Sequence, residues 1–259
     1  MADEAGPVVI VTGSSTGIGE AIARRFARDE NARVVVNSRT AARCEPVAKR
    51  LSSDGHEAVA VPGDVRKKSD VERLVQTAVD RWGRLDVMVN NAGINRIARS
   101  EELSEEDWRL VLDTMLTGTF WGCQAAGRQM LKQDPQGGVI VNISSMWGIT
   151  ANAHRAAYVS SKHGVEGLTK VLAAEWARQN IRVVSICPAF IQTEMDVGDS
   201  SSPVGGYTEE QILHRTPMGR YGTIDEVADA VLYVASPRAT YITGSDILVD
   251  GGWYCYGGW

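Results

Sequence analysis

Tyr158 and Lys162 are the two side chains whose types and spacing point most directly to chemistry in this sequence. Four positions separate them in a strongly helical stretch, so they share one face of the expected helix. A free phenol titrates near pH ~10, and a nearby ammonium favours the phenolate and lowers that value. The hydroxyl of Ser145, just after an apolar run, can orient and polarise a substrate oxygen. The three groups predict a site for proton transfer.

The same residues also have ordinary structural interpretations. A Tyr and a Lys four positions apart are far more often part of an exposed helix face. A serine after a strand is usually a turn or cap residue. The catalytic interpretation gains weight because all of these residues fall on one expected edge of the sheet, where ligands bind in such folds.

A glycine-rich segment, Thr12–Gly19, follows the first apolar run of the chain. Glycines let the backbone approach a pyrophosphate closely, and the N–H groups at a helix N-terminus then bind the anion. No Lys-Ser or Lys-Thr pair follows the glycines, which disfavours a Walker-type nucleoside triphosphate site. The segment predicts a dinucleotide site, with contacts from Gly13, Ser15, Thr16, Gly17, Ile18 and Gly19.

Ser38 and Arg39 end the second expected strand, where dinucleotide folds often carry an acid that binds the adenosine ribose. No acid is present, and Arg39 can instead pair with a 2′-phosphate. This predicts NADP(H) as the preferred cofactor, with NAD(H) possible. Asp64 and Val65, after the third strand, are candidates for the adenine edge. Asp64 also suits a helix cap or turn, and Arg39 suits a solvated residue before a helix.

The elements that must position these residues alternate between short β-branched runs and longer helical patterns. This alternation predicts an α/β fold with one Rossmann-type, doubly wound parallel sheet of about seven strands and helices on both faces. We expect a single dinucleotide-binding and catalytic domain over residues 1–259. The expected strands are Val8–Thr12, Arg33–Asn37, Glu57–Val61, Asp86–Asn90, Gly138–Ile143, Ile181–Cys187 and Ser245–Asp250, and the expected helices are Gly17–Asp29, Ala41–Ser53, Lys68–Trp82, Ser104–Lys132, Ala156–Gln179 and Ile224–Ser236.

A long stretch near residues 194–217 shows no periodicity and is rich in Gly, Ser and Pro. Structureless stretches of this length in a compact domain are usually functional lids or binding loops. We therefore expect a substrate lid here, with a plain surface insertion as the alternative.

Composition excludes several classes of protein. A net charge of -5 provides no basic footprint for nucleic acid or an anionic membrane. No apolar run approaches the ~20 residues that span a bilayer. The four cysteines are scattered without a CxxC pair, which argues against structural disulfides and a zinc site. We expect a cytoplasmic protein without a metal.

Taken together, the motifs resemble those of the short-chain dehydrogenase/reductase family over essentially the whole chain. Within it, the sequence looks most like bacterial glucose 1-dehydrogenases and related sugar or ketone reductases. The matching pieces are Thr12–Gly19, Asp64, Asn90-Asn91-Ala92-Gly93, Ser145, Tyr158, Lys162, Pro188 and Thr193.

The resemblance implies a role for each catalytic residue. Tyr158 would be the general acid/base, and Lys162 would lower its pKa and hold the nicotinamide ribose. Ser145 would bind the reacting oxygen. The cofactor cleft would be lined by Asn91, Ala92, Gly93 and Pro188, with Ile191 and Thr193 against the carboxamide.

The implied function is NAD(P)-dependent hydride transfer between a nicotinamide cofactor and a small alcohol or carbonyl, such as a sugar, polyol or ketone. One alternative is a 3-oxoacyl carrier-protein reductase, whose acidic partner would need a basic patch. Only Arg96, Arg99 and Arg155 could supply one, and several glutamates stand close by. Another alternative is a cofactor-binding regulator without chemistry, but such a protein would have lost Tyr158 or Lys162.

Met115 departs from the family pattern, which has Asn at this place in the fourth helix. In the family this residue helps to hold a water that links the lysine to solvent. Met is a better helix former and lacks the amide, so we expect a more regular helix with the Met115 carbonyl paired internally. The proton relay should be weakened but not abolished.

The substrate pocket is expected to be polar with aromatic walls. The aromatic tail Gly252–Trp259 is expected to close it, in its own or an adjacent subunit, with interface packing as the alternative. The long helices Ser104–Lys132 and Ala156–Gln179 are apolar on more than one side, which predicts a homotetramer. The substrate candidates are Asn95, Arg96, Trp147 and His154.

Overall fold

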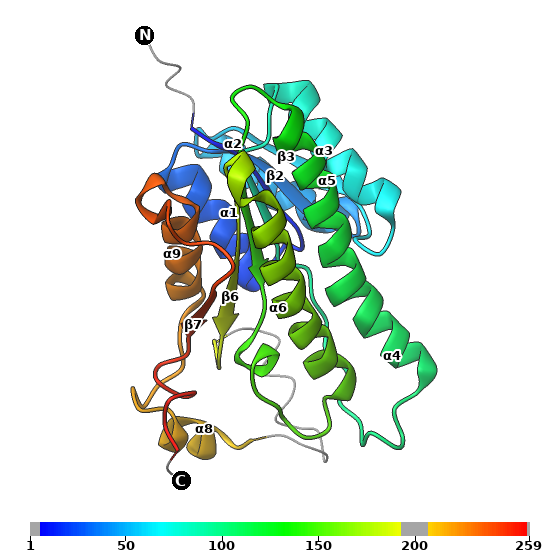
Figure 1. Ribbon diagram of the computed structural model, residues 1–259, viewed down its shortest axis with the longest axis vertical. Coiled ribbons are helices and arrows are strands. Elements are labelled where there is room, and N and C mark those ends of the chain that lie inside the picture. The colour runs from blue at the N-terminus through cyan, green and yellow to red at the C-terminus, as the bar shows by residue number, and fades with distance from the viewer. Residues whose placement is uncertain (1–5, 193–206, 258–259) are drawn as a thin grey trace.

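A seven-stranded parallel sheet with the strand order β3-β2-β1-β4-β5-β6-β7 forms the centre of the protein (Figure 1). The computed structural model describes residues 6–192 and 207–257. Every pair of neighbouring strands is parallel, which confirms the predicted fold class. The strands are β1 (Val8–Val11), β2 (Arg33–Ser38), β3 (Ala58–Pro62), β4 (Val87–Asn90), β5 (Gly138–Ile143), β6 (Ile181–Pro188) and β7 (Asp246–Val249).

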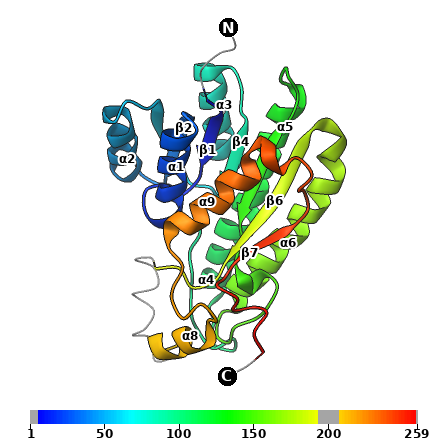
Figure 2. The ribbon, with the colours of Figure 1, turned by 90° about the vertical axis from the view of Figure 1, so that its left-hand side faces the viewer.

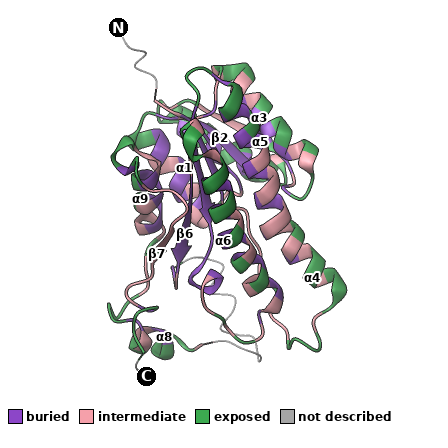
Figure 3. Cartoon of the chain, viewed as in Figure 1, coloured by how far each residue is buried: buried purple, intermediate pink, exposed green. Residues whose placement is uncertain are grey.

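Helices cover both faces of this sheet (Figure 2). Residues alternate between the two faces along each strand, so Val9 and Val11 pack with α1, α2 and α9, whereas Val8 and Ile10 pack with α3, α5 and α6. The central strands are buried throughout, as Figure 3 shows for the interior of the sheet. The helices are α1 (Gly17–Asp29), α2 (Ala41–Ser53), α3 (Lys68–Trp82), α4 (Glu105–Leu112), α5 (Gly118–Lys132), α6 (Ala156–Trp176), α8 (Glu209–Arg215) and α9 (Ile224–Ala235).

The order of the strands places the candidate residues together. β1 lies between β2 and β4, so the chain winds away from β1 in both directions. Loops that leave such a switch point at the carboxyl ends of the strands diverge and open a crevice. The segments that follow β1, β4, β5 and β6 all emerge at this edge, and they carry the glycine turn, Asn91, Ser145 and Ile191.

The expected lid contains one helix that sequence periodicity missed. α8 occupies Glu209–Arg215, so the prediction of an irregular stretch is wrong for these residues. A capping box between Thr208 and Gln211 starts the helix, and such reciprocal caps stabilise even short helices. Residues 193–206 of the expected lid lie outside the described residues.

Candidate active site

The glycine turn after β1 has the backbone shape that a phosphate cradle requires. Gly13 and Gly17 have φ values of 62° and 59°, which side chains rarely adopt. A Cβ on Gly13 would lie 2.8 Å from the Cα of Ala92, whereas the space beside Gly17 is open to 4 Å among the described residues. Thr16, the N-cap residue of α1, makes no side-chain capping hydrogen bond. The turn and the N-terminus of α1 therefore fit a pyrophosphate group.

Two asparagine side chains hold this turn in place. Asn91, after β4, donates from Nδ2 to the carbonyl oxygens of Thr12 (3.0 Å) and Gly13 (3.1 Å). Asn37, in β2, accepts from the Gly13 N–H and donates to the carbonyls of Val61 and Gly63. Asn91 thus lies at the expected cofactor cleft, where its amide supports the turn. Asn37 was missed by sequence reasoning, although a lone polar residue in an apolar strand is a signal for such a role.

The end of β2, where the sequence predicts the adenosine part of the cofactor, carries a positively charged group. Arg39 is exposed and makes no hydrogen bond or ion pair with the described residues, while the hydroxyl of Ser38 donates to the Thr40 carbonyl. Asp64 forms a two-pronged contact with Arg66, with an Nη2–Oδ2 distance of 2.5 Å. Hydrogen bonds from Arg66 hold the pKa of Asp64 below its usual range. The Asp64 carboxylate is therefore ionised and already paired at the position expected to hold adenine.

Tyr158 and Lys162 lie together near the start of α6, as their spacing predicted. The Lys162 Nζ is 5.6 Å from the centre of the Tyr158 ring, and it donates a 2.7 Å hydrogen bond to the carbonyl of Ile143 at the end of β5. Burial lowers the pKa of Lys162 to about 8, and only ionised forms of Cys187 and Glu166 would act in the opposite direction. A buried ammonium beside a phenol stabilises the phenolate and so makes the phenol a better acid.

Ser145 follows β5 and is buried at the start of a short 3₁₀ helix, Met146–Gly148. Its hydroxyl oxygen accepts a hydrogen bond from the backbone N–H of Trp147 at 3.2 Å. That bond fixes the oxygen and leaves the hydroxyl proton available for a ligand. The geometry suits a donor that binds a substrate oxygen.

Aromatic side chains form a continuous wall that begins at Tyr158. Trp147 lies edge-on to Tyr158 and to Phe190, with ring centroids 6.0 and 5.8 Å apart. Phe190 in turn contacts Tyr207 and Trp253, each at 6.0 Å. Trp253 brings the C-terminal tail of the same chain into the wall, and the Arg215 guanidinium lies 3.9 Å from its ring. The sequence predicted Trp147, the tail and the lid near residues 194–217, in which Tyr207 lies, as parts of the pocket, but it offered no signal for Phe190.

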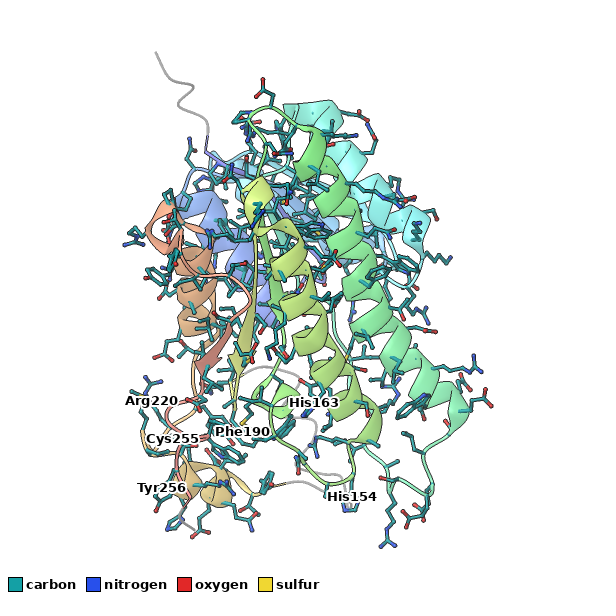
Figure 4. All side chains as sticks on the ribbon, viewed as in Figure 1. His154, His163, Phe190, Arg220, Cys255 and Tyr256 are labelled. Carbon is teal, nitrogen blue, oxygen red and sulfur yellow. The ribbon has the colours of Figure 1, made fainter. Side chains whose placement is uncertain are left out.

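The polar substrate candidates occupy different places. The Asn95 Oδ1 and the Trp147 Nε1 are buried without a hydrogen-bond partner among the described residues. Arg96 faces solvent and pairs with Asp107 at 2.9 Å. His154 accepts a backbone hydrogen bond from the Ala98 N–H, which joins the loop after β4 to the loop before α6. In Figure 4, His154 lies low in the view, in the loop before α6, and Phe190 lies above His154 and to its left.

The remaining cofactor candidates line the same edge of the sheet. Ala92 donates its N–H to the Thr12 hydroxyl, and Gly93 lies beside the side chain of Met115. Ile191 is buried and forms an isolated bridge with Gly222. Thr193 lies outside the described residues. The others that the structure brings to this edge are Val65, which packs against Gly118, and Pro188, at the end of β6.

Met115 lies in a π-helical turn, Asp113–Thr117, that interrupts the helix formed by α4 and α5. The prediction of a more regular helix is therefore wrong, because the irregularity persists without the amide of an asparagine. The Met115 carbonyl does have an internal partner, the Thr119 hydroxyl, which donates at 2.7 Å. A carbonyl has two lone pairs, so this oxygen can also accept from water. The Met115 side chain is buried beside Val111, Ala157 and Tyr158.

We expect Met115→Asn to raise kcat at neutral pH by less than about tenfold, because the outer link of the relay carries only part of acid–base catalysis. Cofactor affinity should stay nearly unchanged, and Tm should fall because an apolar side chain leaves a buried cluster. Steady-state kinetics across pH and thermal unfolding measure these effects. Met115→Leu is the control, since it keeps the packing without an amide. An unchanged kcat and pH profile in Met115→Asn would show that Met115 only packs.

Comparison with known proteins places the chain in the short-chain dehydrogenase/reductase family. The model of the family described as "Enoyl-(Acyl carrier protein) reductase" matches residues 13–254. Glucose 1-dehydrogenase 2 of Bacillus subtilis is 39% identical over 256 residues, which cover 98% of this chain and 97% of that protein. D-threitol dehydrogenase of Mycolicibacterium smegmatis is 38% identical over 248 residues, with coverage of 96% and 93%.

A solved structure of a dehydrogenase has a fold similar to that of this chain. The crystal structure of a gluconate 5-dehydrogenase from Burkholderia cenocepacia, in complex with NADP and tartrate, superposes with a TM-score of 0.90 at 31% identity. The match covers 97% of this chain and 96% of that one. The two proteins are therefore similar in sequence and in fold over nearly the whole length of both chains.

Proposed function

Because this chain belongs to the short-chain dehydrogenase/reductase family, we propose that it interconverts a secondary alcohol and a ketone in a sugar or polyol. The protein is an oxidoreductase that transfers a hydride between a nicotinamide cofactor and an alcohol or carbonyl substrate. The observation that carries the proposal is the buried Lys162 ammonium beside Tyr158, at the sheet edge that also bears the glycine turn.

The proposed reaction assigns one role to each of three side chains. When bound, the nicotinamide dinucleotide supplies or accepts the hydride. In the reducing direction the Tyr158 hydroxyl gives its proton to the carbonyl oxygen, and in the oxidising direction its phenolate takes the alcohol proton. The Lys162 ammonium stabilises that phenolate and is placed to hold the nicotinamide ribose. The Ser145 hydroxyl donates a hydrogen bond to the reacting oxygen.

We assign the cofactor to the cleft between the segments that follow β1 and β4, within one catalytic domain that spans the chain. The pyrophosphate would lie against the turn from Gly13 to Gly19 and the N-terminus of α1. The nicotinamide half would extend toward Pro188, Ile191 and Thr193. No helix among the described residues is both long and apolar enough to cross a bilayer.

The cofactor is proposed to be NADP(H) in preference to NAD(H). We expect Arg39→Ala to lower kcat/KM for NADP(H) by about 10- to 100-fold, since it removes a charge-assisted contact to the 2′-phosphate. The value for NAD(H) should change little. Arg39 supports this because it is exposed and makes no ion pair among the described residues. Steady-state kinetics with each cofactor measures both values, with Arg178→Ala as a control at a remote exposed arginine. A strong NAD(H) preference that Arg39→Ala leaves unchanged would contradict the assignment.

Buried polar atoms without a partner support a hydroxylated substrate. Asn95, Trp147 and Asn152 each bury a polar atom that has no partner among the described residues. Such atoms are costly when unpaired, and ligand hydroxyl groups would satisfy them. Aromatic faces suit the C–H faces of a sugar or polyol. The relatives named for glucose and D-threitol act on ligands of this kind.

A substrate panel tests this proposal. Reduction of NADP+ or NAD+ should be followed with D-glucose, D-threitol and D-gluconate, and oxidation of NADPH with cyclohexanone and a 3-oxoacyl carrier protein. We expect turnover with at least one polyhydroxy compound and little with the carrier protein. Fast turnover of the carrier protein alone would favour the carrier-protein reductase. That alternative lacks support from Arg155, which is buried, and from Arg96, which is paired with Asp107.

The C-terminal tail is proposed to close the pocket of its own chain. Trp253 is buried in the aromatic wall, whereas Tyr254 is half exposed. We expect Trp253→Ala to raise substrate KM roughly tenfold with a smaller change in kcat, since it loosens positioning at the pocket wall. Tyr254→Ala is the matched control and should behave like the wild type. Deletion after Gly252 should reproduce the effect of Trp253→Ala, and unchanged kinetics in a folded truncated protein would contradict the role.

The protein is further proposed to be a cytoplasmic homotetramer. Large apolar side chains remain exposed on the helices that were expected to pair, namely Trp108, Leu131 and Val171. All four cysteines are free thiols, which suits a reducing compartment. Light scattering at micromolar concentration tests the assembly, and a monomer there would contradict it.

A further inference from the structure

A buried carboxyl group one helical turn beyond Lys162 has no part in the proposed reaction. Glu166, on α6, is only 4% exposed. Its Oε2 accepts a 2.6 Å hydrogen bond from the Ser185 hydroxyl in β6, and its Oε1 accepts from the Cys187 thiol at 3.4 Å. A buried acid is costly to place in a core, and its hydrogen bonds to β6 offset part of that cost.

A second carboxyl group, that of Asp246 in β7, lies beside Glu166, because the Ser185 hydroxyl that donates to the Glu166 Oε2 is also 3.4 Å from the Asp246 Oδ1. Asp246 also pairs with the exposed Lys170 at 2.8 Å. Burial, and then the hydrogen bond with Asp246, raises the pKa of Glu166. Burial opposes ionisation of Asp246 as well, but its hydrogen bonds with Glu166 and Lys170 hold its pKa below the usual range. The two shifts run in opposite directions, and they favour protonation of Glu166 over protonation of Asp246.

On its other side, Glu166 abuts the segment that carries Ser145. A Cβ on Gly148 would lie 2.6 Å from the Ser144 Oγ, 3.1 Å from the Glu166 Oε1 and 3.1 Å from the Lys162 carbonyl oxygen. Gly148 thus packs closely over Glu166. The Gly148 N–H donates to the Ser145 carbonyl at 2.8 Å, so the position of Gly148 and the shape of the Ser145 turn are linked.

We propose that Glu166, as a neutral acid that donates to Asp246, is a positioning residue for the segment 144–148 and so for the hydroxyl of Ser145. It joins four elements of the fold: α6, β6, β7 and the turn after β5. In its neutral form it can accept from Ser185 and Cys187 while it donates to Asp246. In this role it acts through the turn that carries Ser145 and not on the reacting atoms. Its effect on turnover rests on the function proposed above for Ser145.

The charged and titratable groups around Glu166 are consistent with a neutral acid. Its own helix contributes Lys162 and Lys170, β6 contributes Cys187 and β7 contributes Asp246. Burial raises the pKa of Cys187 to about 12, so the thiol is neutral at physiological pH. Lys170 neutralises Asp246. If Glu166 were ionised instead, its charge would favour the Lys162 ammonium and its loss would shift the pH profile.

Two substitutions separate hydrogen bonding from charge. Glu166→Gln keeps a donor and an acceptor of the same shape but can never ionise. Glu166→Leu keeps the approximate volume and removes all hydrogen bonds. The control is Leu172→Ala, which disturbs a buried residue on the same helix away from the Ser145 turn. Each variant is assayed with NADPH or NADP+ and the compound of the panel that the wild-type enzyme turns over fastest.

The expected results concern kcat, its pH profile and cofactor binding. Glu166→Gln should keep kcat within about threefold of the wild type, with the same pH profile. Glu166→Leu should lower kcat by roughly tenfold or more, because small displacements of a positioned group are costly. The Kd for NADPH, measured by fluorescence, should stay within about twofold in both variants, as the contacts at the glycine turn are untouched. Leu172→Ala should lose stability without a comparable loss of kcat.

Hydrogen–deuterium exchange of residues 144–150 gives a measurement that does not depend on turnover. The N–H groups of Trp147, Gly148 and Thr150 are hydrogen-bonded within this turn. They should exchange roughly tenfold faster in Glu166→Leu and at the wild-type rate in Glu166→Gln. Wild-type exchange in Glu166→Leu would overturn the positioning role. A low kcat with a shifted pH profile in Glu166→Gln would contradict the proposal that Glu166 acts as a neutral acid. A wild-type enzyme inactive on the whole panel would instead contradict the proposed function.

Discussion

Tyr158→Phe is expected to lower kcat by about 10²–10⁴-fold, the range that general acid–base groups contribute. The substitution removes the hydroxyl but keeps the ring, which lies edge-on to Trp147 with centroids 6.0 Å apart. The pocket should therefore keep its shape. The Kd for NADPH should change little, because the substitution leaves the glycine turn and the N-terminus of α1 unaltered. Single-turnover kinetics and fluorescence titration measure the two quantities separately.

Tyr233→Phe provides the matched control for this experiment. Tyr233 lies on α9, is 45% exposed and belongs to none of the segments that form the site. The control should retain wild-type kcat and Tm. A Tyr158→Phe variant that keeps more than a tenth of the wild-type kcat would mean that another group transfers the proton.

Lys162→Met is expected to lower kcat by at least about 10²-fold, because the phenol loses the ammonium that stabilises its ionised form. Unlike most buried substitutions, it should not lower Tm at pH 7. Burial makes the charged Lys162 unfavourable, as its pKa of about 8 indicates, and Met fills similar space without a charge. Opposite effects on activity and stability are the mark of a group that is kept for function.

The pH dependence of this pair follows from the direction of the Lys162 shift. Burial lowers its pKa in the folded protein to about 8, from 10.5 in the unfolded chain. Between these values the unfolded state binds more protons, so wild-type stability should rise with pH across that window. Turnover that depends on the ammonium should fall over the same range. Lys162→Met should lose the stability gain, which thermal unfolding from pH 7 to 10.5 measures.

Lys132→Met is the control for both effects. Lys132 is exposed at the end of α5, so its removal should change neither kcat nor the dependence of Tm on pH. A Lys162→Met variant with wild-type kcat would remove the lysine from the mechanism. One that loses stability at pH 7 would show that its hydrogen bond to the Ile143 carbonyl outweighs the cost of burying its charge.

Much of the fold follows from local features of the sequence. The expected helices Gly17–Asp29, Ala41–Ser53 and Lys68–Trp82 agree with the structure at both ends, as does the strand Gly138–Ile143. Each of these segments has a clear periodicity or apolar run bounded by turn residues. α8 was missed because it has only seven residues, too few for a periodic pattern, and depends on a capping box.

The candidate site likewise has one part that the sequence predicted and another that it did not. The sequence placed Ser145, Tyr158, Lys162 and the glycine turn at one edge of the sheet, because parallel strands bring their carboxyl ends together. It did not reveal that Asn37 and Asn91 both hold the glycine turn. Those contacts join residues more than twenty positions apart, and their geometry depends on how β1, β2 and β4 pack.

The sequence by itself determined the parallel α/β fold, the proton-transfer pair and the cofactor class, because each depends on residue type and short spacing. Only the tertiary structure decided which polar groups meet. It paired Asp64 with Arg66, kept a π-helical turn at Met115 and brought Glu166 to Asp246 across eighty positions. Long-range contacts of this kind arise from the packing of whole helices on a sheet. No local pattern encodes them, since both partners are fixed only when the layers assemble.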